Sequence, residues 1–462
     1  MKLRWKAAIG NLAAALFIAG PAFAQDPAPA APAAQPAVVA TEPGSIVEGS
    51  TYCAACQAAA EEGGDEDAPW ELTNLFTNSS GRNFLADNGF SLRGNLAQSY
   101  VFNFAGPSDR FNGPVTWTDR SNEYQLNQFY TTFERVTNTE EKFFDIGGRV
   151  DVLAGTNARF VQAYGMDLQW APNNSFYGVV MPQAYGEIAT GKIKTKVGRF
   201  FSPVGYFGVN SADNFFFSLP YTYQHGEPFT HTGTLSTYTG DNFSVGAGVI
   251  RGWDNFNSQN PLASPGLGFL GTASYTFEGG ASVGFVWVYS NEANQNVFVD
   301  GAQQHSPRFL QTFVYQKPIG EKMSYVFQSD FGNQTKALTT GKSAQWYGIN
   351  QYLFYDINDK WTFGTNFEWF QDDDGFRVGG FLPLTGLQNY RGLPLNRVGY
   401  EGSFFQLTVG PKWTPNPNLI VRPNLRFDWF TGEATNGGGL RPFDDGTRNT
   451  QILLGTDVII RF

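Results

Sequence analysis

Hydrophobic and polar residues alternate along short segments of this chain, and the last segment shows the pattern most clearly. Between Thr450 and Phe462, one face carries Ile452, Leu454, Val458, Ile460 and Phe462, with Thr456 as its polar exception. The other face carries Gln451, Gly455, Asp457 and Arg461, interrupted by Leu453 and Ile459. Since side chains alternate across a β-strand, one face suits lipid and the other mostly water. We expect Phe462 to end a strand that closes a sheet, because hydrocarbon tolerates no open edge.

The same reading predicts sixteen strands, an even number. They span residues 90–104, 122–135, 142–154, 177–189, 193–202, 229–239, 242–252, 267–277, 281–290, 308–317, 322–332, 344–356, 361–371, 402–413, 419–431 and 449–462. The phase of the alternation is ambiguous near 122, 177, 229 and 344.

The connections between these strands alternate strictly between short turns and long loops. Short ones include 240–241, 278–280 and 358–359, all with turn residues, while long ones include 105–121, 203–228 and 372–401. This arrangement favours an all-β fold, a transmembrane antiparallel β-barrel with short periplasmic turns and long extracellular loops. A secreted β-sandwich or propeller is the alternative, but no motif repeats every 40 to 50 residues, as a propeller requires.

Composition points the same way. The chain holds 43 Phe, 20 Tyr, 11 Trp and 53 Gly, and only 16% of its residues are charged. Soluble domains usually carry nearer a quarter charged residues, whereas barrels combine polar lumens with aromatic girdles.

The first 80 residues lie outside the strand pattern. Residues 1–24 have the form of a secretory signal peptide, with three cations, an apolar run and a small-residue cleavage site. Cleavage leaves 28 cations against 41 acids, a net charge of −13. Residues 25–80 form a Pro/Ala-rich and then acidic tail, which we expect to be disordered in the periplasm, ahead of an outer-membrane barrel at 81–462. Cys53 and Cys56 suit a disulfide better than a redox or metal site.

Residues that could carry enzyme chemistry are sparse. Among the three histidines, His225 and His231 lie close to Glu227 in sequence, which makes a metal site conceivable, although a loop hydrogen-bond network is the commoner arrangement. The acidic run 372–374 more often forms a solvated loop than a cation site. No phosphate loop or nucleophile motif appears. We therefore expect no enzyme activity, no catalytic residue, no metal and no cofactor.

Several segments resemble the putative OmpL-like β-barrel porin-2 family. They are Phe84–Gly94, Gln125–Tyr130, Gly198–Tyr206 and Gly226–Gly233, together with Gly252, Trp253 and Asp254. The resemblance covers about residues 80–462 and implies an outer-membrane porin. It supplies no catalytic motif and indicates no particular solute.

Two functional classes follow. A third alternative, a hydrolase such as a lipase, would need a site at His231 or His305. The first is a water-filled channel for passive diffusion of small hydrophilic solutes, since sixteen strands enclose more space than their side chains fill. The second is a structural or adhesive barrel, plugged by its loops or tail and used for surface display or envelope attachment. The partners expected are outer-membrane lipid, small solutes or ions and the barrel-assembly machinery, with a homotrimer possible and no nucleic acid.

The long loop at 203–228 is a candidate constriction, because so apolar a loop is poorly placed in bulk water. Its candidate residues are Asn210, Asp213, Phe215, Phe216, Phe217, Tyr221 and Tyr223. A basic arc is predicted on lumen faces near the seam between the last and first strands, formed by Arg93, Arg149, Lys412, Arg422, Arg426 and Arg461. Asp428 and Asp457 lie within it and partly neutralise it. We hypothesise that the arc opposes the loop across the narrowest point and gives weak anion preference.

Overall fold

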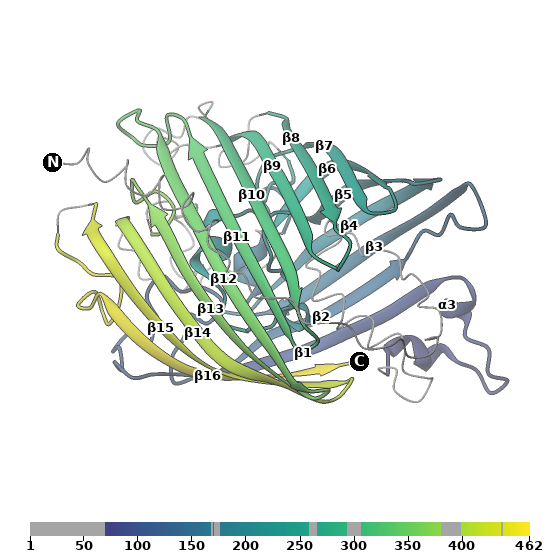
Figure 1. Cartoon of the computed structure of the whole chain (residues 1–462), viewed down its shortest axis with the longest axis horizontal. Helices are drawn as coiled ribbons and strands as arrows, with labels where there is room; N and C mark the ends of the chain where they lie inside the picture. The colour runs from purple at the N-terminus through teal and green to yellow at the C-terminus, as the bar shows by residue number, and fades with distance from the viewer. Residues whose placement is uncertain are drawn as a thin grey trace, which may run out of the picture. The chain divides into compact units, whose positions relative to one another are not determined.

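The computed structural model describes residues 70–167, 170, 176–257, 266–292, 306–379, 399–435 and 438–462. Within these residues, sixteen antiparallel strands close into one barrel. Each strand pairs with its neighbours in the chain, and β16 (Thr450–Arg461) pairs with β1 (Phe90–Asn103). Figure 1 shows the strands side by side around the wall. The predicted fold class is confirmed.

The strand bounds follow the predicted ranges to within a few residues. The remaining strands are β2 (Tyr124–Arg135), β3 (Phe144–Gly155), β4 (Gly178–Thr190), β5 (Ile193–Phe201), β6 (Thr230–Thr239), β7 (Phe243–Ile250), β8 (Gly268–Thr276), β9 (Ser282–Glu292), β10 (Ser306–Ile319), β11 (Met323–Gln334), β12 (Ala344–Asn358), β13 (Trp361–Asp372), β14 (Tyr400–Asn416) and β15 (Leu419–Ala434). The short helices are η1 (Leu72–Phe76), α3 (Phe84–Asp87), α4 (Ala158–Val161), η3 (Ser211–Asp213) and η4 (Thr222–Gly226). No helix in the described part of the chain is long and apolar enough to span a membrane.

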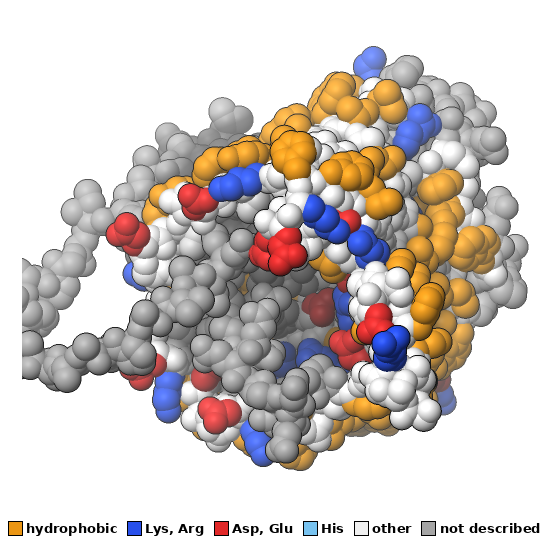
Figure 2. All heavy atoms as spheres, turned by 90° about the vertical axis from the view of Figure 1, so that its right-hand side faces the viewer, with side chains coloured by type: hydrophobic (Ala, Val, Ile, Leu, Met, Phe, Trp, Pro, Cys, Tyr) orange, Lys and Arg blue, Asp and Glu red, His pale blue; other side chains and the backbone are white. Residues whose placement is uncertain are grey.

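The alternation along each strand separates an outer apolar face from an inner face. In β16, Leu454 is 47% exposed whereas its neighbour Leu453 is 3% exposed, so the two side chains lie on opposite faces of the wall. Figure 2 shows hydrophobic side chains along the outside of the barrel and charged side chains around and within the hollow. An apolar outer band is what a barrel wall presents to lipid.

Strand closure involves the C-terminal residue as the sequence predicts. The backbone N–H of Phe462 donates to the carbonyl of Gly94 at 2.9 Å, which extends the β1–β16 ladder by one residue. The ring lies over Gly94, where a Cβ would approach the Phe462 ring to 2.6 Å, and 5.9 Å from the ring of Phe129. Glycine at position 94 therefore leaves room for the terminal aromatic ring.

The chain segment before the barrel is folded at its end. In η1, the hydroxyl of Thr73 donates to the carbonyl of Leu92 at 2.9 Å and accepts from its N–H at 2.6 Å. The backbone N–H of Trp70 donates to Asn418 at 3.2 Å, in the turn between β14 and β15. The expected disorder is therefore wrong for residues 70–80, because the Thr73 hydroxyl and the Trp70 backbone bond to the short-turn end of the barrel. The predicted signal peptide, the rest of the tail, Cys53 and Cys56 lie outside the described residues.

Candidate functional site

The barrel interior holds one of its own loops. We call residues 202–229, between β5 and β6, loop 3. The backbone N–H of Ser202 donates to the carbonyl of Phe229 at 2.9 Å, which closes the base of the loop. From there the loop enters the lumen, and most of its side chains are buried. Its aromatic content, which would be costly in bulk water, is thus covered by the inner wall.

A carboxylate of β13 and an indole N–H of β12 anchor the second half of loop 3. Glu368 on β13 accepts from the N–H groups of Tyr221 and Thr222 at 2.6 and 2.5 Å, and from the Thr222 hydroxyl at 2.7 Å. On β12, Trp346 Nε1 donates to the carbonyl of Gly226 at 3.0 Å. Buried backbone groups need partners, so these wall side chains take the role that a neighbouring strand would otherwise play.

A carboxyl pair lies where the loop meets β11. Gln328 Nε2 donates to Glu227 Oε1 at 2.5 Å and to Asp330 Oδ1 at 2.9 Å. Burial, with the neighbouring Asp330 adding to it, raises the pKa of Glu227 well above its usual range. The remaining Oε2 of Glu227 has no hydrogen-bond partner among the described residues. Loop 3 is therefore held at this point by a carboxyl group that favours its protonated form.

Three arginines of the predicted arc bond directly to loop 3. On β15, Arg422 Nη1 donates to the carbonyl of Ser211 at 2.8 Å, and Arg426 Nη1 donates to that of Leu219 at 2.6 Å. On β16, Arg461 Nη2 donates to the carbonyl of Ala212 at 3.0 Å. The hypothesis that the arc faces loop 3 across a gap is wrong for these three side chains, because the loop lies on them.

Neighbouring acids neutralise the two β15 arginines. Arg422 forms a bidentate ion pair with Asp457, and Arg426 Nε lies 2.8 Å from Asp428 Oδ1. All four side chains are buried. Asp428 also accepts from the hydroxyl of Tyr221 at 3.0 Å, which ties the pair to loop 3. Buried ion pairs contribute little net stability, but this cluster also bonds to loop 3 and so positions the loop.

Small wall residues receive the bulky side chains of the loop. A Cβ on Gly364 of β13 would lie 2.3 Å from the ring of Phe215, and one on Gly455 of β16 would lie 2.5 Å from the ring of Phe217. Leu453 and Ile459, which interrupt the polar face of β16, are buried inside the barrel. Ile459 belongs to the apolar cluster that includes Ala212 of loop 3. Part of the inner wall is thus shaped to fit loop 3.

The other predicted loop residues occupy different positions. Asn210 accepts from Asn95 of β1 at 2.7 Å. Phe216 packs against Phe215, with ring centroids 4.7 Å apart. Asp213 lies near Arg93, Arg149 and Arg461 but forms no ion pair with any described residue.

An aromatic cluster joins loop 3 to two other long loops. Trp117 of loop 1 (residues 104–123) lies 5.8 Å from the rings of both Tyr223 and Phe229. Phe160, in the described part of loop 2 (residues 156–177), lies 6.0 Å from the same tryptophan. Phe207 completes the cluster, 6.1 Å from Tyr223. Loops 1, 2 and 3 therefore share one apolar contact inside the barrel.

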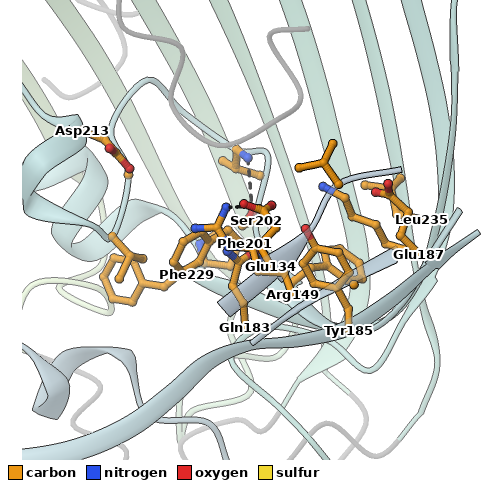
Figure 3. Close-up of a pocket in the computed structure, with 18 of the residues that line it drawn as sticks. Glu134, Arg149, Gln183, Tyr185, Glu187, Phe201, Ser202, Asp213, Phe229 and Leu235 are labelled. Carbon is orange, nitrogen blue, oxygen red and sulfur yellow. Dashed lines mark hydrogen bonds and ion pairs between the residues drawn. The ribbon is translucent and has the colours of Figure 1, made fainter. Parts of the chain in front are cut away.

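A cavity of about 280 Å³ remains between loop 3 and the inner faces of β1 to β6. Figure 3 shows Asp213 on the loop, set apart from Glu134 and Arg149, which project from the strands. Tyr223, Phe229 and Phe207 of the aromatic cluster form its apolar side. The cavity is therefore charged along the strands and largely apolar along the loop.

The remaining arc residues divide between this cavity and β14. Arg93 and Arg149 line the cavity and both pair with Glu134. Lys412 lies on the inner face of β14, where it pairs in register with Thr362 and does not line the cavity. The structure therefore does not bring the six cations together as one continuous surface. Their role in ion selectivity stays a prediction.

The residues considered for metal or enzyme chemistry serve structural contacts. His225 Nε2 hydrogen-bonds to the carbonyl of Pro114 at 2.8 Å, while His231 bonds through Nδ1 to the carbonyl of Gly252 and through Nε2 to Ser202, both at 3.0 Å. The described residues contain no group of three or more His, Cys, Asp or Glu placed to hold a metal ion. Asp372 accepts from the N–H groups of residues 376–378, at 3.0, 2.7 and 2.8 Å. His305 lies outside the described residues.

Sequence reading missed the polar side chains that fasten the loop. Gln128 of β2 donates to the carbonyl of Val209 at 2.8 Å and accepts from the N–H of Ser211 at 2.9 Å, and Gln328 and Asn350 act similarly on β11 and β12. The available signal was their position: each is an uncharged amide on the inner face of a strand.

A closed membrane-type barrel with a long loop folded into its lumen defines the class of outer-membrane porins. The family model of the putative β-barrel porin-2, OmpL-like family matches residues 89–462. The chain belongs to this family, as the sequence resemblance predicts. The comparison with curated proteins finds no match.

Solved structures show the same fold at low sequence identity. The outer-membrane channel DcaP of Acinetobacter baumannii is 11% identical, with a TM-score of 0.52, over 82% of this chain and 99% of that one. OprB of Pseudomonas putida is 14% identical, with a TM-score of 0.52, over 82% and 95%. An anion-selective porin from Comamonas acidovorans is 8% identical, with a TM-score of 0.50, over 81% and 99%. At these identities the likeness concerns the fold alone.

Proposed function

We propose that this porin is a water-filled channel through which small hydrophilic solutes diffuse passively across the outer membrane. The observation that carries the proposal is the cavity between loop 3 and the β1–β6 wall, which is lined by charged side chains. Charged groups sealed in dry protein would cost desolvation energy, so charges lining an unfilled space favour a cavity that holds water. Loop 3 would then act as the constriction of the channel.

Besides Arg135 and Lys196, the cavity is lined by two accessible cations of the predicted arc, Arg93 and Arg149. Their side chains are 38% and 20% exposed, whereas that of Arg422 is 1% exposed beneath loop 3. A weak anion preference would therefore come from the cavity wall and not from β15. Glu134, which pairs with both exposed arginines, keeps the field modest.

The proposed setting follows from the same barrel. The outer apolar band would contact outer-membrane lipid, the short turns would face the periplasm, and the tail before the barrel would lie in the periplasm. Insertion would depend on the barrel-assembly machinery reading the C-terminal strand. A homotrimer remains compatible with this arrangement.

A structural or adhesive barrel is the second candidate, and the aromatic cluster favours it. Trp117, Phe160, Tyr223 and Phe229 pack three loops together inside the barrel, which is how a plugged lumen would be built. In that case the role of the protein would be surface display or envelope attachment.

Reconstitution of the purified protein separates the two candidates. Liposome swelling with arabinose reports entry of a small neutral solute, and conductance in planar bilayers reports openness and ion preference. A diffusion channel admits arabinose and gives stable single-channel steps. The absence of both signals from protein with normal heat-modifiable migration would exclude the channel and favour the plugged barrel.

A further inference from the structure

The strand side of the cavity presents hydrogen-bond donors from Arg93 and Arg149, whose partner carboxylates are already occupied. A further lining carboxylate, Glu187, accepts from the Thr137 hydroxyl. Glu134 on β2 pairs with Arg93 through one oxygen and with Arg149 through the other. Asp151 on β3 accepts from Arg149 Nε at 2.9 Å, and its second oxygen accepts from Gln183 at 2.8 Å. The two arginines are part-exposed and carry more N–H groups than these acids use. Arg93 and Arg149 therefore give part of the strand side a guanidinium surface suited to an anionic group.

The loop side of the cavity presents the opposite charge. Asp213 ends the short helix η3 and lines the cavity. Burial raises the pKa of this carboxyl, while Arg461, Arg149 and Arg93 oppose that rise. It forms no ion pair with any described residue, although three arginines lie near it, so a cation in direct contact would further stabilise its ionised form.

The rest of the loop side of the cavity is largely apolar. Val209, Phe207 and Phe229 of loop 3 contribute to the lining, on the same side as Asp213. A volume of about 280 Å³ lies just below the range of roughly 300–1,000 Å³ typical of sites for drug-sized ligands. The cavity therefore suits a ligand with two opposite charges and a small apolar side chain.

We propose that the cavity is a binding site for small zwitterions, namely amino acids and dipeptides, on the path through the channel. The ligand carboxylate lies against Arg93 and Arg149, and its ammonium group lies against Asp213. Opposed charges orient such a dipolar solute, whereas a neutral sugar gains only hydrogen bonds from them. This inference rests on the proposed channel function and adds the class of solute.

Block of single-channel current by alanyl-alanine tests the site. Two analogues each remove one charge of the ligand: the N-acetylated dipeptide lacks the ammonium group, and the dipeptide amide lacks the carboxylate. The unmodified dipeptide should block at a concentration at least about tenfold lower than either analogue, since a hydrogen bond to a charged group contributes roughly that factor or more. Arabinose is the neutral reference.

Two variants assign the charges to residues. Asp213→Asn should raise the blocking concentration of the dipeptide and its amide about tenfold and leave the acetylated form unchanged, because only the contact with the ammonium group is lost. The double variant Arg93→Gln and Arg149→Gln should have the reverse effect. It should weaken block by the dipeptide and by the acetylated form and leave block by the amide unchanged. Asp241→Asn and Arg448→Gln make charge changes of the same sign at exposed positions and should have no effect.

The outcomes separate this inference from the channel function. A protein that gives no conductance and admits no arabinose contradicts the channel itself. A conducting protein that the dipeptide and both analogues block equally, or whose block survives Asp213→Asn, overturns the zwitterion site alone. Tighter block by arabinose than by the dipeptide would assign the cavity to sugars instead. Heat-modifiable migration of each variant confirms that the barrel is folded.

Discussion

Glu368 is the wall residue whose replacement should affect loop 3 most. Its carboxylate accepts three hydrogen bonds from Tyr221 and Thr222, and the surroundings are fully buried. In Glu368→Ala the two backbone N–H groups lose their acceptor at a site closed to solvent. Leaving a buried donor unsatisfied costs about 1–3 kcal/mol each, so docking of the loop should weaken by roughly 2–6 kcal/mol.

The lower part of this range is the better expectation, because the substitution also removes a buried carboxylate and its desolvation cost. Since about 1.4 kcal/mol is a factor of ten, a loss of about 3 kcal/mol would lower the ratio of docked to undocked loop by roughly 100-fold. Undocking widens the lumen and exposes residues 202–229. Single-channel conductance and the rate of proteolytic cleavage within loop 3 should therefore both rise.

The matched control is Glu401→Ala, which removes an exposed carboxylate from β14. It should leave both measurements unchanged. Glu368→Gln keeps one acceptor oxygen and should fall between the wild type and Glu368→Ala. If Glu368→Ala folds normally and shows the wild-type conductance and cleavage rate, then these three hydrogen bonds do not hold the loop.

Four further predictions concern assembly and ion passage. Deleting residues 453–462 should abolish insertion into the outer membrane, because β1 loses its partner, and normal heat-modifiable migration of the product would contradict the closure by β16. Removing residues 25–69 should leave the barrel intact, and failure of that variant to fold would give the tail a structural role. Replacing Arg93 and Arg149 with Gln should shift the reversal potential under a salt gradient toward cations, and an unchanged potential rules them out as selectivity elements. The pKa of Asp213 is raised, so on acidification this carboxyl should become neutral at a higher pH than an ordinary aspartate, whose pKa is about 3.9. Anion preference should increase at that step in the wild type, and the step should be missing in Asp213→Asn.

The strands could be predicted from the sequence because each is a local pattern. Alternation of side chains and turn residues both act over a few positions, so Leu454 and Asp457 could be assigned to opposite faces without knowing their neighbours. The inward fold of loop 3 had a weaker signal, its apolar content. What the sequence could not supply was the partner of each lumen residue.

The predicted basic arc shows why the partners of lumen residues could not be predicted from the sequence. Arg422 and Arg426 were placed correctly on the inner face by strand phase, yet phase says nothing about which loop segment lies above them. The carbonyls of Ser211 and Leu219, which these arginines bind, are backbone atoms that any residue type would supply. Wall glycines such as Gly364 gave an overlooked signal, since a strand interior normally disfavours glycine unless another group approaches closely.

Loop 3 also bears on how the barrel is completed. The seam joins the first and last strands to be made, and loop 3 contacts both: Asn210 bonds to Asn95 of β1, and Ala212 bonds to Arg461 of β16. The loop leaves the wall between β5 and β6, far from the seam in sequence, and reaches across the interior to it. Docking of the loop and pairing of the seam therefore favour one another thermodynamically. Loop 3 thus supports the joint between β1 and β16 from inside the barrel.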